Sequence, residues 1–185
     1  PSEEPLPEGY VLNLTFEEFA DYIVDSIKNH TYDEYGLWNL CTSYYNNFEA
    51  NNTKGQVDAY YVREVFIPAV QEMKQCFVAK QKSVSRYKQT KIVLKVYDNM
   101  IDSIMSYVVT NIYHTELNPE EFVKYLDIRI KEGIDDYKLQ DIIVDYIKNS
   151  DDVLETLSVL SEFANPFKQF ESDETVNMEQ MEIIN

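Results

Sequence analysis

Apolar residues recur at three- and four-residue steps along most of the chain, and this spacing predicts a protein built from helices. The clearest pattern covers four successive segments at residues 92–113, 119–131, 137–148 and 153–163. One face of the first segment carries Val93, Val96, Tyr97, Met100, Ile101, Ile104, Val108 and Ile112. We therefore expect a helical bundle core here, with the helix from about residue 90 to residue 113 as its longest and central element.

Two helical patterns lie near the N-terminus. Thr15 and Glu18 have the spacing of a capping box, in which each side chain accepts a hydrogen bond from the other residue's backbone N–H. A helix should therefore begin after Thr15 and fray near His30. A second helix is predicted from about Asp33 through Phe48, with Trp38 read as a core residue rather than a functional anchor.

A third pattern runs from Val57 to Phe77, after a loop-like Asn-Asn-Thr-Lys-Gly stretch at residues 51–55. Pro68 lies inside this pattern. Because proline removes a backbone donor and clashes with the preceding turn, we expect a kink or a helix restart near Ile67.

The later helices carry clear start and stop signals. Asn118 is a helix cap followed by Pro119 at the first helical position, and Gly133 suits the left-handed position after a helix end. Asp135 or Asp136 can cap the next helix, and residues 150–152 the last one.

The totals fit one globular domain. The chain has 185 residues, 44% of them hydrophobic, and only 4 glycines. We predict an all-α, single-domain bundle of about six to seven helices over residues 15–170. An extended, Pro- and Glu-rich lead-in over residues 1–14 should precede it, and an acidic tail over residues 171–185 should follow it.

The charge distribution is uneven. The formal net charge is −17, which disfavours binding to nucleic-acid phosphates. Residues 74–97 nevertheless contain seven basic residues and no acid; we call these the basic strip: Lys74, Lys80, Lys82, Arg86, Lys88, Lys91 and Lys95. Two interpretations stay open. In the first, the strip docks an acidic partner such as a tubulin tail, an anionic lipid surface or a phosphate group, and the contact is centred on Lys80, Lys82, Arg86, Lys88 and Lys91. In the second, the strip is a solvated connector that faces the protein's own acidic helices.

No residue pattern announces a catalytic chemistry. His30 and His114 are single and lie at predicted helix ends, and the acidic pairs lack the spacing of a calcium loop. Cys41 and Cys76 have no neighbouring Cys or His at zinc-ligand spacing, so we expect ordinary buried thiols. We expect no enzyme, no cofactor, no metal site and no transmembrane segment.

Several segments resemble the BART-like domain, an all-helical module of effectors of Arf-like small GTPases and of a cilia-associated relative. The matching segments are Val96-Tyr-Asp-Asn-Met-Ile-Asp-Ser-Ile-Met-Ser-Tyr-Val108, Leu117-Asn-Pro-Glu-Glu-Phe122, Asp141-Ile-Ile143 and Asn149-Ser-Asp-Asp-Val-Leu154, together with Ile23-Val-Asp-Ser-Ile27 and Tyr44-Tyr-Asn-Asn-Phe-Glu49. Their order and approximate spacing follow the helices of that family. The basic strip is an addition, since it lies where the family has a short connection.

The resemblance implies a non-catalytic protein-interaction module that recognises a GTP-loaded Arf-like GTPase in the cytoplasm or at the cilium or cytoskeleton. In that family a hydrophobic cleft between the later helices receives an amphipathic helix of the GTPase. Carried over by position, the residues expected to line the cleft are Ile101, Ile104, Phe122, Tyr125, Leu126, Ile142, Tyr146 and Val153.

Two other functions remain open from the sequence. In the first alternative, the chain is a constitutive structural subunit of a larger assembly, for example a ciliary one. In the second, it is an acidic, viral-type helical antagonist. The first alternative predicts large exposed apolar patches on the isolated chain. The second fits the acidic charge and the Asn- and Tyr-rich composition.

Overall fold

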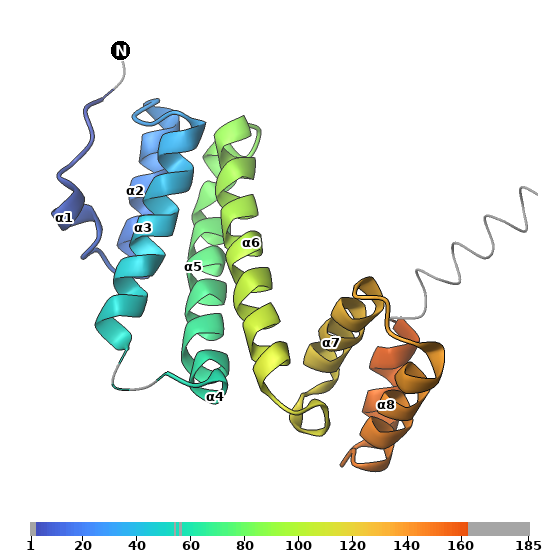
Figure 1. Ribbon diagram of the computed structural model, residues 1–185. Coiled ribbons are helices and arrows are strands. Elements are labelled where there is room, and N and C mark those ends of the chain that lie inside the picture. Colours follow the sequence, from blue (N-terminus) through green and yellow to red (C-terminus); the bar gives the residue numbers. More distant parts are fainter. Residues whose placement is uncertain (1–2, 54, 56, 163–185) are drawn as a thin grey trace, which may run out of the picture. The chain divides into compact units, whose positions relative to one another are not determined.

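The computed structural model of the protein describes residues 3–53, 55 and 57–162 (Figure 1). Every regular element in those ranges is helical, and none of the residues described is in a strand. The predicted all-α bundle with one long helix is therefore confirmed. The acidic tail predicted over residues 171–185 lies outside the described residues.

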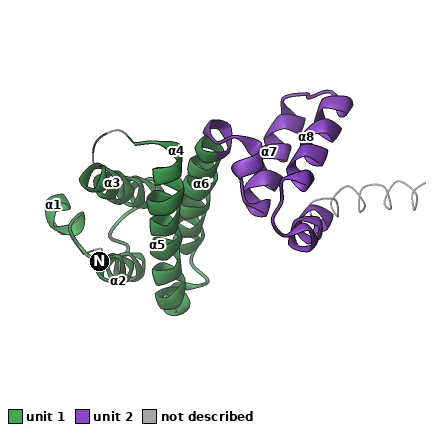
Figure 2. Cartoon of the chain, turned by 90° about the horizontal axis from the view of Figure 1, so that it is seen from below, with its two compact units in different colours: residues 1–108 green, residues 109–185 purple. Residues whose placement is uncertain are grey.

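The chain divides into two compact units, residues Pro1–Val108 and Val109–Asn185 (Figure 2). The boundary falls inside α6 (Lys88–Asn111), the long helix. Where the sequence predicts a single bundle over residues 15–170, the structure thus has two units, each with its own buried side chains. We describe each unit by itself.

Unit 1 is built on α2 (Phe16–Lys28), α3 (Glu34–Asn52), α5 (Ile67–Lys80) and the first part of α6, which alternate in direction (Figure 1). The predicted capping box is present: the Glu18 N–H donates to Thr15 Oγ1 at 3.2 Å, and the Thr15 N–H donates to Glu18 Oε1 at 3.1 Å. At the other end of α2, His30 has a φ of 52°, and the Thr31 N–H donates to the Ser26 carbonyl oxygen at 3.0 Å. This left-handed turn ends the helix.

The helical chain that leads into α5 changes its helix type near Ile67, where the sequence predicted a kink or restart. α4 (Ala59–Tyr61) continues as a π-helical turn, η1 (Val62–Phe66), and regular α-helix begins at Ile67. Pro68 lies in the first turn of α5, where its missing N–H is tolerated best. The expected restart near Ile67 is confirmed, although the wide turn that precedes it was not predicted.

The lead-in requires a correction. Residues Glu8–Val11 form a short helix, α1, rather than extended chain. Pro7 directly precedes it, and the Asn13 side-chain amide donates to the Gly9 carbonyl oxygen at 2.6 Å. Val11 is completely buried in the core of unit 1, and the hydrophobic effect of burying it fixes this segment against the bundle.

The core of unit 1 is aromatic and closely packed. The Phe19 and Tyr44 rings are stacked with centroids 3.8 Å apart, and the Tyr44 hydroxyl donates to the Leu14 carbonyl oxygen at 2.5 Å. Cys41 is fully buried, as predicted, and Trp38 is partly buried against the same core.

Unit 2 contains η3 (His114–Glu116), α7 (Pro119–Lys131), α8 (Asp136–Lys148) and a helical segment at residues 153–162. The Asn118 side chain and Glu121 form a second capping box, and Gly133, which follows the C-cap residue Glu132 of α7, has a φ of 84°. The Asn118 cap and the Gly133 stop were predicted from the sequence, and the reciprocal bond to the Glu121 side chain was not. The buried apolar residues of this unit are Val109, Ile112, Leu117, Phe122, Leu126 and Tyr146.

Candidate protein-interaction surfaces

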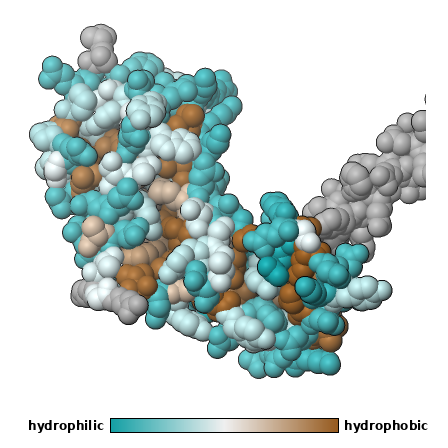
Figure 3. All heavy atoms as spheres, viewed as in Figure 1, coloured by the Kyte–Doolittle hydropathy of each residue, from teal (hydrophilic) through white to brown (hydrophobic). Residues whose placement is uncertain are grey.

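Unit 2 leaves several aliphatic side chains in solvent. We call these residues the apolar surface of unit 2, and their exposed fractions are 48% for Val144, 45% for Val153, 82% for Leu154 and 46% for Leu157. Val144 lies on α8, and the other three lie on the helical segment 153–162. Figure 3 shows hydrophobic residues on the visible surface of each unit.

The segment 153–162 is fixed by polar contacts on its inward side. Thr156 is 2% exposed, and its hydroxyl donates to the Asp152 carbonyl oxygen at 2.8 Å and lies 2.6 Å from the Ser150 hydroxyl. The Asp152 carboxylate accepts from the Glu155 N–H at 3.0 Å, which caps the segment. A threonine therefore occupies the buried position that a leucine normally takes.

A surface helix usually buries its apolar residues and exposes its polar ones; this segment exposes two leucines together with its polar residues, and it buries a threonine beside the partly buried Val159 and Leu160. Here Thr156 is inward and Leu154 and Leu157 are outward. Most of the Leu154 side chain and about half of the Leu157 side chain are exposed, so this apolar surface is available for a contact outside the unit.

The eight residues expected to line a cleft are divided between the two units. Ile101 and Ile104 belong to unit 1, where both are partly buried against its core. The six others belong to unit 2: Phe122, Tyr125, Leu126, Ile142, Tyr146 and Val153.

In unit 2 the structure brings three of these residues together as core. Phe122, Leu126 and Tyr146 are 4% exposed or less. The Phe122 ring is stacked on Tyr146 with centroids 3.7 Å apart and lies 6.0 Å from the Tyr125 ring. Tyr125 and Ile142 are partly buried, and Val153 is exposed. Of the six expected cleft residues in unit 2, Val153 has the most exposed side chain.

The exposure of Leu154 and Leu157 was missed, because their spacing reads as a core face when the chain is considered alone. A second pattern in the same segment predicts a different inward face. Residues 156, 159 and 160 also have helical spacing, and Ser150 and Asp152 supply the hydrogen bonds that a buried Thr156 requires.

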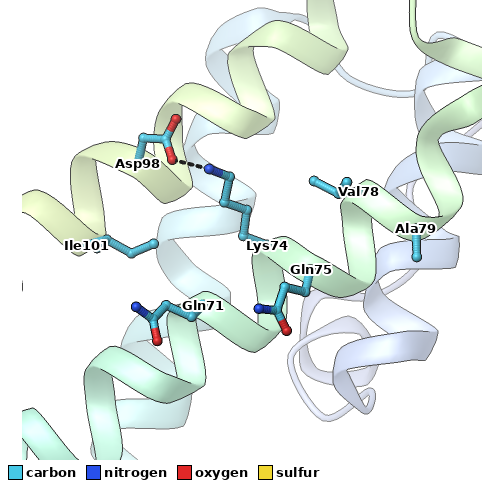
Figure 4. Close-up of a pocket in the computed structure, with 7 residues that line it drawn as sticks. All are labelled: Gln71, Lys74, Gln75, Val78, Ala79, Asp98 and Ile101. Carbon is cyan, nitrogen blue, oxygen red and sulfur yellow. Dashed lines mark hydrogen bonds and ion pairs between the residues drawn. The ribbon is translucent and has the colours of Figure 1, made fainter.

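Unit 1 carries grooves on its own surface, and two of them involve residues expected to line the cleft. One, of about 670 Å³, lies between α5 and α6, and the ion pair between Lys74 Nζ and Asp98 Oδ1, at 2.6 Å, lines it with Val78 and Ile101 (Figure 4). The other, of about 330 Å³, is lined by residues that include Phe66, Ile104 and Tyr107. Ile101 and Ile104 thus each line a groove within unit 1.

The basic strip spans the end of α5, the 3₁₀ turn η2 (Gln81–Val84) and the start of α6. Three of its cations pair with acids of unit 1: Lys74 with Asp98 at 2.6 Å, Lys80 with Asp21 at 2.7 Å and Lys88 with Glu34 at 3.1 Å. The remaining four are exposed and pair with no acid in the described ranges: Lys82, Arg86, Lys91 and Lys95. Three cations of the strip thus face the protein's own acids, and docking of an acidic partner stays a prediction for the other four.

The two thiols differ in accessibility. Burial raises the pKa of Cys41 to about 12, so this thiol stays protonated in the folded protein. Cys76 is partly buried, and burial together with the Glu17 and Glu72 carboxylates raises its pKa as well. Neither thiol has the low pKa of a reactive nucleophile.

His114 lies next to a carboxylate, that of Asp145. Its Nε2 lies 2.8 Å from Asp145 Oδ2, and its ring stacks against Tyr125 with centroids 6.0 Å apart. The pair joins η3 to α8 and has a structural role in unit 2.

Within the ranges that the structure describes, no three His, Cys, Asp or Glu side chains gather closely enough to hold a metal ion. Of the helices in those ranges, none combines the length and the hydropathy that crossing a lipid bilayer requires.

No known protein family, curated protein or solved structure matches the chain.

Proposed function

We propose that the protein is a non-catalytic protein-interaction module, and that the apolar surface of unit 2 docks an amphipathic helix of its partner. One observation carries this proposal: the segment 153–162 buries Thr156 and exposes Leu154 and Leu157. An exposed leucine side chain gains free energy when a second apolar surface covers it.

The energy available from such a contact is substantial. Fully burying one leucine side chain is worth roughly 1.5–3 kcal/mol relative to leaving it exposed. Leu154, at 82% exposure, has most of that free energy still to gain. Helix-in-groove recognition uses apolar anchors of this kind at helical spacing.

The partner that we propose is a GTP-loaded Arf-like small GTPase. The support for this choice is the resemblance to the BART-like domain, whose later helices correspond to α7, α8 and residues 153–162. The same resemblance favours a cytoplasmic or ciliary site of action. Of the cleft residues that the resemblance implies, Val153 belongs to the apolar surface of unit 2.

The test uses purified Arf-like GTPases, each loaded with GDP or with a non-hydrolysable GTP analogue, over the immobilised chain. We expect binding with the analogue and at least roughly tenfold weaker binding with GDP. Leu154→Asp should weaken binding, because it places a charge in the docking face. Tyr35→Asp is the matched control, since Tyr35 is 75% exposed on α3 of unit 1.

A constitutive structural subunit is the second candidate, and the same exposed leucines favour it. A permanent partner would cover the apolar surface of unit 2 irrespective of nucleotide. Equal binding in GDP and in the analogue, weakened by Leu154→Asp, would support this candidate over the effector.

A further inference from the structure

The four unpaired cations of the basic strip lie at one end of unit 1. Lys82 and Arg86 belong to the connection between α5 and α6, and Lys91 and Lys95 to the first two turns of α6. The α2–α3 connection lies at the same end (Figure 1), where the His30 ring stacks on Tyr87 with centroids 6.3 Å apart.

Two acids of the α2–α3 connection have partners of their own, whereas Asp25 in the last turn of α2 is exposed. Glu34 pairs with Lys88 at 3.1 Å, and the Asp33 carboxylate accepts from the Gly36 N–H at 2.6 Å as the cap of α3. None of the four exposed cations forms an ion pair with an acid in the described ranges, although the chain as a whole carries a net charge of −17.

Two of these cations occupy positions that oppose helix stability. Lys91 lies in the first turns of α6, where the positive end of the helix dipole disfavours a cation. Lys91 and Lys95 are four residues apart, so their like charges face each other on one side of the helix. An anion bound at this position relieves both repulsions.

We propose that this end of unit 1 binds an acidic segment of a partner protein through Lys82, Arg86, Lys91 and Lys95. The site is separate from the apolar surface of unit 2, so this proposal stands or fails independently of the proposed function. The chemistry required of the ligand is a run of carboxylates on an extended chain.

Shape favours a peptide over a flat anionic membrane. Exposed Asp33 and partly exposed Glu34 lie among the cations at this end, and a planar surface would bring its anions against them. The net charge of −17 would also repel an extended anionic surface. An extended peptide covers a smaller area than a planar surface, so fewer of its anions meet these acids.

The experiment measures binding of a fluorescently labelled oligoglutamate peptide to the full chain by anisotropy, at low and at physiological ionic strength. We expect saturable binding that weakens with salt, since exposed charges are screened. The double variant Lys91→Glu/Lys95→Glu should bind at least roughly tenfold more weakly. Its melting temperature should be no lower than that of the unchanged protein, so loss of binding is not loss of fold.

Lys138→Glu/Lys148→Glu is the matched control, because it changes the net charge by the same amount on α8. Retained binding by this variant supports a local site. The proposal is overturned by absent binding at low salt, by equal losses in both double variants, or by tighter binding to phosphatidylserine-containing vesicles than to the peptide. The last result would assign the surface to membranes.

Discussion

The ring of Tyr146 on α8 lies flat against the ring of Phe122 on α7, with centroids 3.7 Å apart and planes 6° apart. The Tyr146 hydroxyl continues past this stack and donates to the Leu117 carbonyl oxygen at 2.8 Å. Burial raises the pKa of this phenol to about 12, so it remains a donor at any physiological pH. One side chain thus joins three successive parts of unit 2.

Tyr146→Phe should destabilise unit 2. The substitution keeps the stacked ring and leaves the buried Leu117 carbonyl oxygen without its donor, which costs roughly 1–2 kcal/mol in the free energy of unfolding. Urea denaturation followed by circular dichroism measures the change. Tyr137→Phe is the control, because Tyr137 is 80% exposed, and it should alter stability by less than about 0.5 kcal/mol. Equal effects of the two variants would show that the hydrogen bond to Leu117 does not stabilise the unit.

Acid should weaken the start of α2. Hydrogen bonds from the Thr15 backbone and side chain lower the pKa of Glu18 from 4.5. Because the folded pKa is the lower one, the stabilisation is present above pH 4.5 and is lost as the pH falls through the folded value. Glu18→Gln keeps the hydrogen-bond acceptor and removes the titrating group. Its stability should therefore vary less with pH between about 5 and 3 than that of the unchanged protein. A difference that does not depend on pH over this range would contradict the assignment.

The two thiols should react at different rates. Cys41 is completely buried, and Cys76 is partly accessible on α5. With an aromatic disulfide reagent at neutral pH, we expect one slow thiol in the folded protein and a second only after denaturation. Cys76→Ser should abolish the reaction of the folded protein, whereas Cys41→Ser should leave it. Rapid modification of both thiols without denaturant would show that the core around Cys41 opens readily.

Lys91→Glu should stabilise the protein. Glutamate at this position interacts favourably with the start of α6 and forms an (i, i+4) pair with Lys95 in the favourable orientation, together worth roughly 0.5–1 kcal/mol. Lys148→Glu makes the opposite change in the last turn of α8 and should destabilise slightly. Thermal denaturation of the two variants distinguishes this account from a uniform effect of net charge, which would shift both in the same direction.

The helices themselves were largely predictable, because the signals that begin and end them are local. The side chains of Thr15 and Asn118 each reach a backbone N–H three residues later, and Gly133 takes the positive φ that its position requires. These contacts depend on a few consecutive residues. The short helix α1 was missed, because burial of Val11 by the rest of unit 1 stabilises it.

The candidate surfaces were predictable only in part. The sequence shows the surplus of basic residues, but the pairing of Lys80 with Asp21 joins residues far apart in the chain, and only the fold reveals which cations remain unpaired. Phe122 and Tyr146 were expected to line a cleft, and they are buried against each other instead. Spacing identifies one face of a helix, but tertiary packing decides whether that face is buried.

The exposed leucine Leu154 in segment 153–162 gives the most direct test of the central proposal. Binding of analogue-loaded Arf-like GTPases is measured for the unchanged protein, Leu154→Asp and Tyr35→Asp, with circular dichroism of each variant. The account predicts nucleotide-dependent binding that Leu154→Asp weakens by roughly tenfold or more and that Tyr35→Asp leaves unchanged. Absence of binding to any loaded GTPase, or binding that Leu154→Asp does not affect, would contradict it.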